Sequence, residues 1–558
     1  MRLSIAICCA LLVAPMISKA TPDDLLSRAE RTNYAETSRY SDVLEFIAEL
    51  QRMSSLVRTE SFATTTEGRA LPLVILSRPA INTPAQAARS GKPVVFVMAN
   101  IHAGEVEGKE AMQHLMRDLV KGPGDPILDQ IILLVAPIYN ADGNDKISIT
   151  NRTAQNGPKG GVGTRENAAR LDLNRDFMKL ESPEARGLIV NVFNRWDPHV
   201  VIDLHTTNGS YHGYALTYSP ALNPNSDRRL VSFAREKLLP SVTAGMKAKH
   251  NYNVYFYGNF VDAKNPNNEI AGGDGTAPKA WATFDHRPRF GNNYVGLRNR
   301  IAILSEAYSY LDFRSRVDVT YKFVREILNY VAGHASDVRR LVRAADSAAA
   351  ATGSTAGNED GFGIGFDLFA SPNPVDILVG GVNRVIDPRT NRPRLEATRE
   401  SRPVKMTEYG EFRATRRIKP PAAYILTPDQ RTVIDLLLKH GITVEKTRKA
   451  ESFDVTEYLV KSVSRAERPF QGHRETKVSV ESVETREQFP AGSFVVSMNQ
   501  PKAALVFYLL EPESDDGIAN WNIIDDELDR AVKAGGSQAY PVYRLTAKPR
   551  VPRDVVTQ

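Results

Sequence analysis

The chain has 558 residues, well beyond one ordinary domain, so we expect two or more domains with sizeable cores. Its content of 42% hydrophobic, 24% charged and 8% aromatic residues is typical of globular proteins and argues against collagen-like, coiled-coil and wholly disordered chains. The formal charge of +6 is the difference between 71 basic and 65 acidic residues mixed along the chain, so we expect no nucleic-acid partner.

The first 20 residues are typical of a secretory signal peptide. Arg2 precedes an apolar stretch over residues 3–17, and small residues end the segment at Ala20. The stretch is short for a bilayer span, so we expect cleavage after Ala20 rather than a retained membrane anchor. Both cysteines, Cys8 and Cys9, lie inside this segment, and a cysteine-free mature chain suits a secreted or periplasmic bacterial protein.

Apolar runs typical of buried strands alternate with a helical pattern over the next 300 residues. The strands are expected at residues 71–76, 94–98, 131–138, 200–204 and 301–304, and the helix at residues 106–120. Strand, helix and strand in succession predict βαβ units, so we expect an α/β fold with an open mixed sheet. Glu107, Lys109 and Glu110 are expected on a solvated face of that helix.

A small, polar, alanine- and glycine-bearing segment divides the chain. Residues 344–360 are expected to form a flexible linker between a catalytic domain, residues 21–343, and a C-terminal domain, residues 361–558. A strand at 422–426 and a helix at 432–438 predict a smaller α/β or α+β fold for the second domain. No motif in it carries chemistry, and the acidic run 511–516 is expected to be an exposed loop rather than a calcium site.

A His-Ala-Gly-Glu sequence, residues 102–105, follows the strand at 94–98 directly. His102 and Glu105 can direct an imidazole nitrogen and a carboxylate at one point, and zinc accepts both kinds of ligand. His205 ends the strand at 200–204 and can reach the same sheet edge. Two His and one Glu leave a fourth position open, which is typical of a catalytic zinc ion.

Further polar groups follow in a defined order: Asn140-Ala141-Asp142-Gly143, Arg152, Asp172-Leu173-Asn174-Arg175-Asp176-Phe177 and Ser305-Glu306. Together with the predicted zinc ligands, this order resembles the M14 family of zinc carboxypeptidases, the carboxypeptidase A type, over roughly residues 40 to 340. The resemblance implies an open mixed eight-stranded sheet flanked by helices. Alanine and Asp176 stand where the family usually has proline and asparagine, and neither change removes a catalytic group.

The resemblance also implies roles for individual residues. His102, Glu105 and His205 would hold one Zn²⁺, and Asp172 would accept the free ring N–H of His102. Glu306 would act as general base.

The remaining roles concern substrate groups. Arg152, preferred over Arg165, would stabilise the oxyanion. Asn174 and Arg175 would bind the free carboxylate of the substrate, and Tyr294 is a candidate for the family's mobile tyrosine. His212 is placed in a loop that could border the pocket.

These residues predict an exported zinc metallocarboxypeptidase that hydrolyses a C-terminal peptide bond in a substrate with a free carboxylate. One alternative keeps the zinc site but has a cell-wall peptide or an N-acyl amino acid as substrate. The other alternative is an inactive protein that only binds carboxylate ends. The preferred side chain of the substrate stays open.

Overall fold

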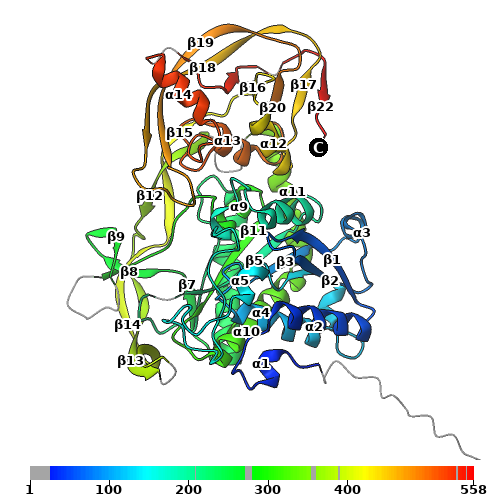
Figure 1. Cartoon of the computed structure of the whole chain (residues 1–558), viewed down its shortest axis with the longest axis vertical. Coiled ribbons are helices and arrows are strands. Elements are labelled where there is room, and N and C mark those ends of the chain that lie inside the picture. The colour runs from blue at the N-terminus through cyan, green and yellow to red at the C-terminus, as the bar shows by residue number, and fades with distance from the viewer. Residues whose placement is uncertain are drawn as a thin grey trace, which may run out of the picture.

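A computed structural model describes residues 25–207, 209–270, 279–353, 360–387, 390–535, 538–547 and 549–557. Its largest feature is an eight-stranded mixed sheet with strand order β1-β2-β4-β3-β5-β11-β6-β7 (Figure 1). The strands are β1 Val57–Thr64, β2 Ala70–Leu76, β3 Val94–Ala99, β4 Ile132–Ala136, β5 Val200–Thr207, β6 Leu216–Ser219, β7 Val254–Phe256 and β11 Ile301–Tyr308. The predicted open mixed α/β sheet is confirmed.

The middle of this sheet is parallel and fully buried. Strands β4, β3, β5 and β11 pair in parallel, and every residue of β3, β4 and β5 is buried. Parallel strands covered on both faces consist of continuous apolar runs, which is why their positions could be read from the sequence.

Helices cover both faces of the sheet. Helix α4, Glu107–Leu119, lies over Leu204 of β5, where Gly108 comes so close that an added Cβ would lie 2.8 Å from the Leu204 Cβ. On the opposite face, Phe96 of β3 packs against Phe193, with ring centroids 5.9 Å apart. The helices and short turns of this part are α1 Arg28–Arg31, α2 Tyr40–Met53, α3 Pro84–Arg89, η2 Pro126–Asp129, α5 Ala141–Asp145, η3 Leu173–Arg175, α6 Pro183–Gly187, η4 Leu188–Phe193, α7 Arg228–Ser232, η5 Phe233–Leu238, α8 Leu239–His250, α9 Gly291–Leu297, α10 Phe313–Gly333 and α11 Ala335–Thr352.

The prediction that α4 has a solvated face is wrong. Glu107, Lys109 and Glu110 are each at most 1% exposed. Residues near the N-terminus cover the helix: the Ser38 N–H and the Thr37 hydroxyl both donate to the Glu110 carboxylate, at 2.7 and 2.8 Å. A charged helix face therefore became internal because a segment distant in sequence supplies its hydrogen bonds.

Residues 344–352, predicted as linker, continue helix α11 instead. Their alanine-rich sequence favours helix strongly, and Gly353, with φ of 67°, ends the helix in the left-handed conformation. The rest of the predicted linker, residues 354–359, lies outside the described residues.

The chain after the predicted linker does not form one separate domain. Its strand β14, Arg392–Tyr409, pairs in parallel with β10, Lys279–Ala282, which belongs to the first part of the chain. The resulting five-stranded sheet has the order β13-β14-β10-β8-β9, with β13 Val375–Asp387, β8 Asn259–Asp262 and β9 Asn265–Glu269. A two-stranded ribbon joins this sheet to the end of the chain and consists of β12 Phe362–Phe369 and β15 Glu411–Ile418.

The described residues between 423 and 557 contain a seven-stranded antiparallel sheet, which lies above the large sheet in Figure 1. Its order is β19-β18-β21-β16-β20-β17-β22, with β16 Ala423–Leu426, β17 Glu445–Thr447, β18 Glu451–Arg465, β19 Thr476–Phe489, β20 Phe494–Ser497, β21 Tyr543–Leu545 and β22 Arg553–Val555. Three helices pack with it: α12 Arg431–Lys439, α13 Ala503–Leu510 and α14 Asp525–Lys533. We call residues 423–557 the C-terminal unit; its antiparallel pairing makes it α+β.

Among the described residues, no helix is both long and apolar enough to cross a bilayer. The predicted signal peptide, including Cys8 and Cys9, lies outside the described residues.

Candidate zinc centre and substrate pocket

The site residues lie where the central strands end. His205 and Glu306 are direct neighbours in the register of β5 and β11, so their side chains point to the same face of the sheet. His102 comes three residues after β3, and Glu105 two residues before α4. A hydrogen bond from the Glu105 N–H to the His102 carbonyl (2.9 Å) closes the tight turn between them.

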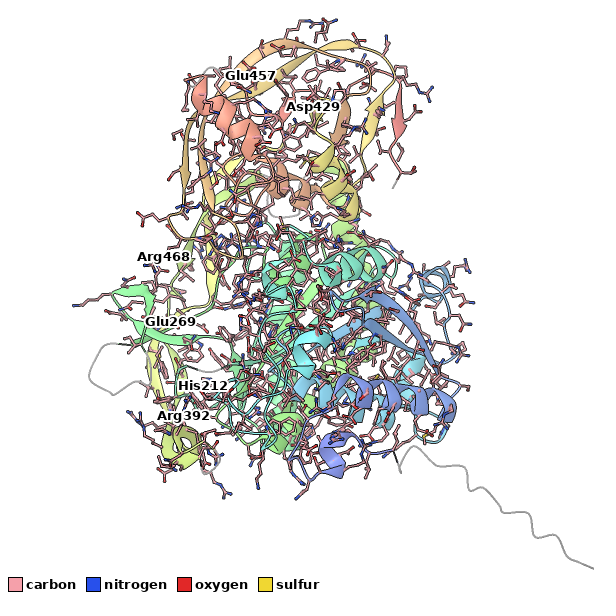
Figure 2. All side chains as sticks on the ribbon, in the orientation of Figure 1. His212, Glu269, Arg392, Asp429, Glu457 and Arg468 are labelled. Carbon is pink, nitrogen blue, oxygen red and sulfur yellow. The ribbon has the colours of Figure 1, made fainter. Side chains whose placement is uncertain are left out.

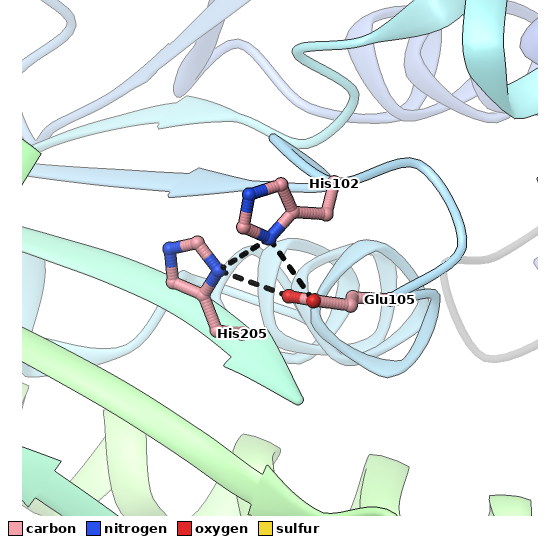
Figure 3. Close-up of side chains that lie close together, drawn as sticks. All are labelled: His102, Glu105 and His205. Atoms are coloured by element: carbon pink, nitrogen blue, oxygen red, sulfur yellow. Dashed lines mark hydrogen bonds and ion pairs between the residues drawn. The ribbon is translucent and has the colours of Figure 1, made fainter. Parts of the chain in front are cut away.

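The structure brings His102, Glu105 and His205 together in one buried cluster (Figure 3). The Nδ1 atoms of the two histidines are 3.3 Å apart. Glu105 places Oε1 3.0 Å from the His102 Nδ1 and Oε2 2.9 Å from the His205 Nδ1. These atoms all lie within 4.8 Å of one another, close enough to share one metal ion.

The outward ring nitrogens of both histidines have carboxylate partners. His102 Nε2 lies 3.0 Å from Asp172 Oδ1, and His205 Nε2 lies 2.9 Å from Asp203 Oδ2. A ring that donates its outer N–H to a carboxylate presents a lone pair on the inner nitrogen, and this arrangement is typical of metal-ligating histidines. Asp203 was missed in the sequence, although it is two residues from His205 and therefore on the same strand face.

The chemistry of the donor set fits a divalent cation. With both outer nitrogens protonated, two imidazole lone pairs and one carboxylate converge, and a cation relieves their mutual repulsion. Burial would raise the pKa of Glu105, but the charges of His102 and Arg152 hold it well below its usual value. Burial would lower the pKa of His205, but Asp203 and Glu105 raise it well above its usual value. The cluster therefore favours positive charge at its centre.

Glu306 is half-buried and lies beside the cluster. Burial raises the pKa of this carboxyl to about 8; the charge of His205 opposes this rise, and that of Glu105 adds to it. A carboxylate whose pKa is raised towards neutral pH is a stronger base than an ordinary carboxylate, and its acid form gives the proton up again, as a group that acts as base and then as acid needs.

Two arginines border the cluster. Arg152 Nη1 lies 3.1 Å from Glu105 Oε1, and Arg152 Nη2 donates to the Thr206 carbonyl at 3.2 Å. Gly104 makes room for it, since a Cβ there would collide with the Arg152 side chain. Arg165 instead directs Nε and Nη2 at Asp172 Oδ2, at 3.0 and 2.8 Å. Arg165 Nη1 also lies 3.5 Å from His102 Nδ1 and 4.0 Å from Glu105 Oε1, so both arginines border the predicted zinc ligands and Arg152 makes the closer contact.

Asn174 and Arg175 lie on the short turn η3, and Asp172 is the residue that caps its N-terminal end. The Asp172 carboxylate caps the turn by accepting the Asn174 N–H at 2.9 Å. The Arg175 guanidinium lies 3.9 Å above the ring of Phe290, and burial lowers its pKa. Asn174 Oδ1 accepts the Gly291 N–H at 2.9 Å. Both side chains line the pocket, and the Arg175 cation rests on an aromatic face that orients it.

A pocket of about 990 Å³ joins these residues, lined by His102, Glu105, Arg152, Arg165, Asn174, Arg175, His205 and Glu306. The β8–β9 hairpin forms part of its rim and carries Glu269, labelled in Figure 2. The Tyr257 phenol also lines the pocket, and burial followed by the Glu306 charge raises its pKa. Sequence reasoning missed Tyr257, although it follows the short apolar strand β7 directly.

Tyr294, predicted to bind substrate, does not reach this pocket. It is fully buried on α9, its hydroxyl is 2.8 Å from His440 Nδ1, and it accepts a hydrogen bond from Arg298 at 3.2 Å. The prediction is wrong because α9 turns this side chain toward the C-terminal unit. His212, also labelled in Figure 2, is likewise outside the pocket lining; its ring packs against Tyr308 with centroids 4.1 Å apart.

Residues 43–273 match the family model described as zinc carboxypeptidase, peptidase M14. Carboxypeptidase 2 of Trichophyton tonsurans is 24% identical over 517 residues, covering 88% of this chain and 85% of the relative. Carboxypeptidase 2 of Trichophyton rubrum is 24% identical over 527 residues, covering 90% and 85%. A metallo-carboxypeptidase structure from Burkholderia cenocepacia aligns with a TM-score of 0.38 at 15% identity, over 54% of this chain and 70% of that one.

Proposed function

We propose that the chain is an M14-type zinc carboxypeptidase that removes the C-terminal residue of peptides by zinc-dependent hydrolysis, as the match of residues 43–273 to that family model supports. The observation that carries this proposal is the convergence of His102, Glu105 and His205 at the end of the sheet, with Glu306 and Arg175 in the same pocket. We further propose that the chain is exported by its first 20 residues.

His102, Glu105 and His205 would hold the zinc ion, each histidine fixed by its outer carboxylate. Zinc supplies Lewis-acid chemistry at such a site, since it polarises a carbonyl and lowers the pKa of water. Glu306 would accept the proton of the attacking water and return it to the leaving amine. Arg152 stabilises the negative charge that develops on the carbonyl oxygen.

Substrate selection rests on Arg175. Its guanidinium can form two parallel hydrogen bonds with a terminal carboxylate, and it lies on the Phe290 ring rather than in a closed ion pair. The nearest carboxylate oxygen with which it pairs, on Asp172, is 4.0 Å from its Nη1. A free carboxylate can therefore take the open face of this cation.

The test compares a peptide that has a free C-terminus with the same peptide as an amide. We expect release of the C-terminal residue from the acid, little turnover of the amide, loss of activity in a chelator and recovery on adding zinc. Equal turnover of acid and amide would contradict the carboxypeptidase proposal. Faster turnover of a cell-wall peptide or an N-acyl amino acid would instead assign the same zinc site to that substrate.

A further inference from the structure

The C-terminal unit contacts the segments that form the wall of the substrate pocket at two places. One is the connection between β18 and β19, residues 466–475, and the other is the acidic turn at residues 515–516. The acidic turn was predicted to be exposed, but Asp516 is fully buried and its neighbour Asp515 lines the pocket. Neither segment supplies one of the predicted zinc ligands. Their contribution to the site is therefore sought in the residues that they contact.

Gln471, in the β18–β19 connection, contacts the turn that carries the predicted carboxylate clamp, Asn174 and Arg175. Its Oε1 accepts the backbone N–H of Asp172 at 2.8 Å. Asp172 caps the N-terminal end of η3, where its own carboxylate accepts the Asn174 N–H. The amide of Gln471 therefore fixes the start of the turn from which Arg175 projects.

The acidic turn holds the other side of the clamp. Asp516 accepts hydrogen bonds from the Arg289 N–H at 2.5 Å and from Arg289 Nε at 2.8 Å. The next residue, Phe290, is the ring beneath the Arg175 guanidinium, and Gly291 donates to Asn174. Glu475 of the β18–β19 connection adds a contact of 2.7 Å to Arg289 Nη1.

We propose that the C-terminal unit positions the carboxylate clamp, with Gln471 and Asp516 as its positioning residues. The two residues act on Arg175 through different segments: Gln471 through the turn that carries Arg175, and Asp516 through the segment that carries the Phe290 ring. Such contacts fix the orientation of the Arg175 guanidinium. A small displacement of that group weakens its hydrogen bonds with the substrate carboxylate, because those bonds require a defined geometry. This inference rests on the proposed carboxypeptidase function.

The first variant for the test is Gln471→Met, which keeps the side-chain length but removes the acceptor. Gln471 is half-exposed, so one lost neutral hydrogen bond leaves the fold intact. We expect KM for a free-acid peptide to rise about three- to tenfold, the worth of one such bond, with kcat and bound zinc unchanged. Cleavage of an amidated peptide should not change.

The matched control is His473→Gln, in the same connection. His473 also contacts the first part of the chain, at 2.6 Å from Glu181 Oε1, but Glu181 is outside the pocket lining. We expect its KM to equal that of the wild type. An equal rise in both variants, an unchanged KM in Gln471→Met, or a fall in kcat with loss of zinc would each overturn the inference.

The acid preference of the wild type separates this inference from the proposed function. A wild type without that preference refutes the proposed function itself. A wild type that prefers the acid, with a Gln471→Met variant that behaves identically, refutes only the positioning role.

Discussion

Two of the buried clusters of ionisable groups in the described residues differ in what they face: the cluster around Glu511 and the predicted zinc site of His102, Glu105 and His205. In the C-terminal unit, Glu511 is 1% exposed and accepts hydrogen bonds from the Tyr424 and Tyr458 hydroxyls at 2.5 and 2.9 Å. Arg544 Nε lies 3.6 Å from the same carboxylate. Every partner belongs to the C-terminal unit, and burial raises the pKa of Glu511.

The zinc cluster has the same ingredients in a different arrangement. Its side chains are also buried and also contact one another, and the pKa values of Glu105 and His205 are shifted, but the cluster borders an open pocket. A shifted pKa alone therefore does not identify a functional site in this protein. What identifies the functional site is the pocket beside the cluster, because a substrate can reach the buried side chains only from that side.

The largest expected effect is that of Glu306→Gln, which keeps the shape of the side chain but removes the base. We expect kcat to fall by about 10²- to 10⁴-fold with zinc content and KM little changed. Steady-state kinetics with metal analysis would measure both. The control is Glu269→Gln, on the rim of the same pocket, which should retain its kcat. An equal loss of kcat in the two variants would contradict the assignment of Glu306 as the general base.

Arg175→Ala should weaken substrate binding and leave the chemical step, and therefore kcat, little changed. We expect KM on a free-acid peptide to rise about ten- to a hundredfold, since a hydrogen bond between charged groups is worth ~1.5 to 3 kcal/mol. The matching amide should be affected little, and the ratio of the two KM values is the measurement. A uniform change on acid and amide would place Arg175 outside carboxylate recognition.

Glu511→Gln tests the closed cluster. We expect the free energy of unfolding to fall by about 1 to 3 kcal/mol, because Arg544 loses the carboxylate charge and one of the two tyrosine hydroxyls faces an amide NH2 instead of an acceptor oxygen. Peptidase activity should stay at the wild-type level, since no group of this cluster lines the pocket. Urea unfolding followed by a peptide assay measures both quantities. Glu481→Gln, at an exposed ion pair with Lys461, is the control and should lower stability by less than about 0.5 kcal/mol.

The smallest expected effect is that of His440 on the free energy of unfolding, and this effect depends on pH. It is fully buried between the two parts of the chain, and burial lowers its pKa to about 3. Between pH 6.5 and 3 the unfolded chain therefore binds a proton that the folded chain does not, so stability falls as the pH falls, by up to about 1.4 kcal/mol per pH unit.

The His440→Gln variant should lose this contribution. Urea unfolding at pH 6.5 and 5.5 should show the wild type losing about 1 kcal/mol more than the variant over that interval. Parallel losses in the two proteins would mean that His440 accepts a proton in the folded state.

Much of the sheet and of the candidate site followed from local sequence. Strands buried on both faces must be continuous apolar runs, so β3, β5 and β11 could be located from residues 94–98, 200–204 and 301–304. Since parallel strands end at one edge of a sheet, residues that follow them meet there. This rule anticipated that His102, Glu105, His205 and Glu306 would come together, although their numbers span 200 positions.

The sequence by itself determined which segments are strands and which polar residues follow them, because both depend on neighbours along the chain. The tertiary structure alone decided which polar residues are buried and what they face. Tyr294 points away from the pocket, helix α4 is covered by Ser38, and the acidic turn at Asp516 is internal. Each outcome depends on a partner from a distant part of the chain, and a polar side chain is buried only where such a partner completes its hydrogen bonds.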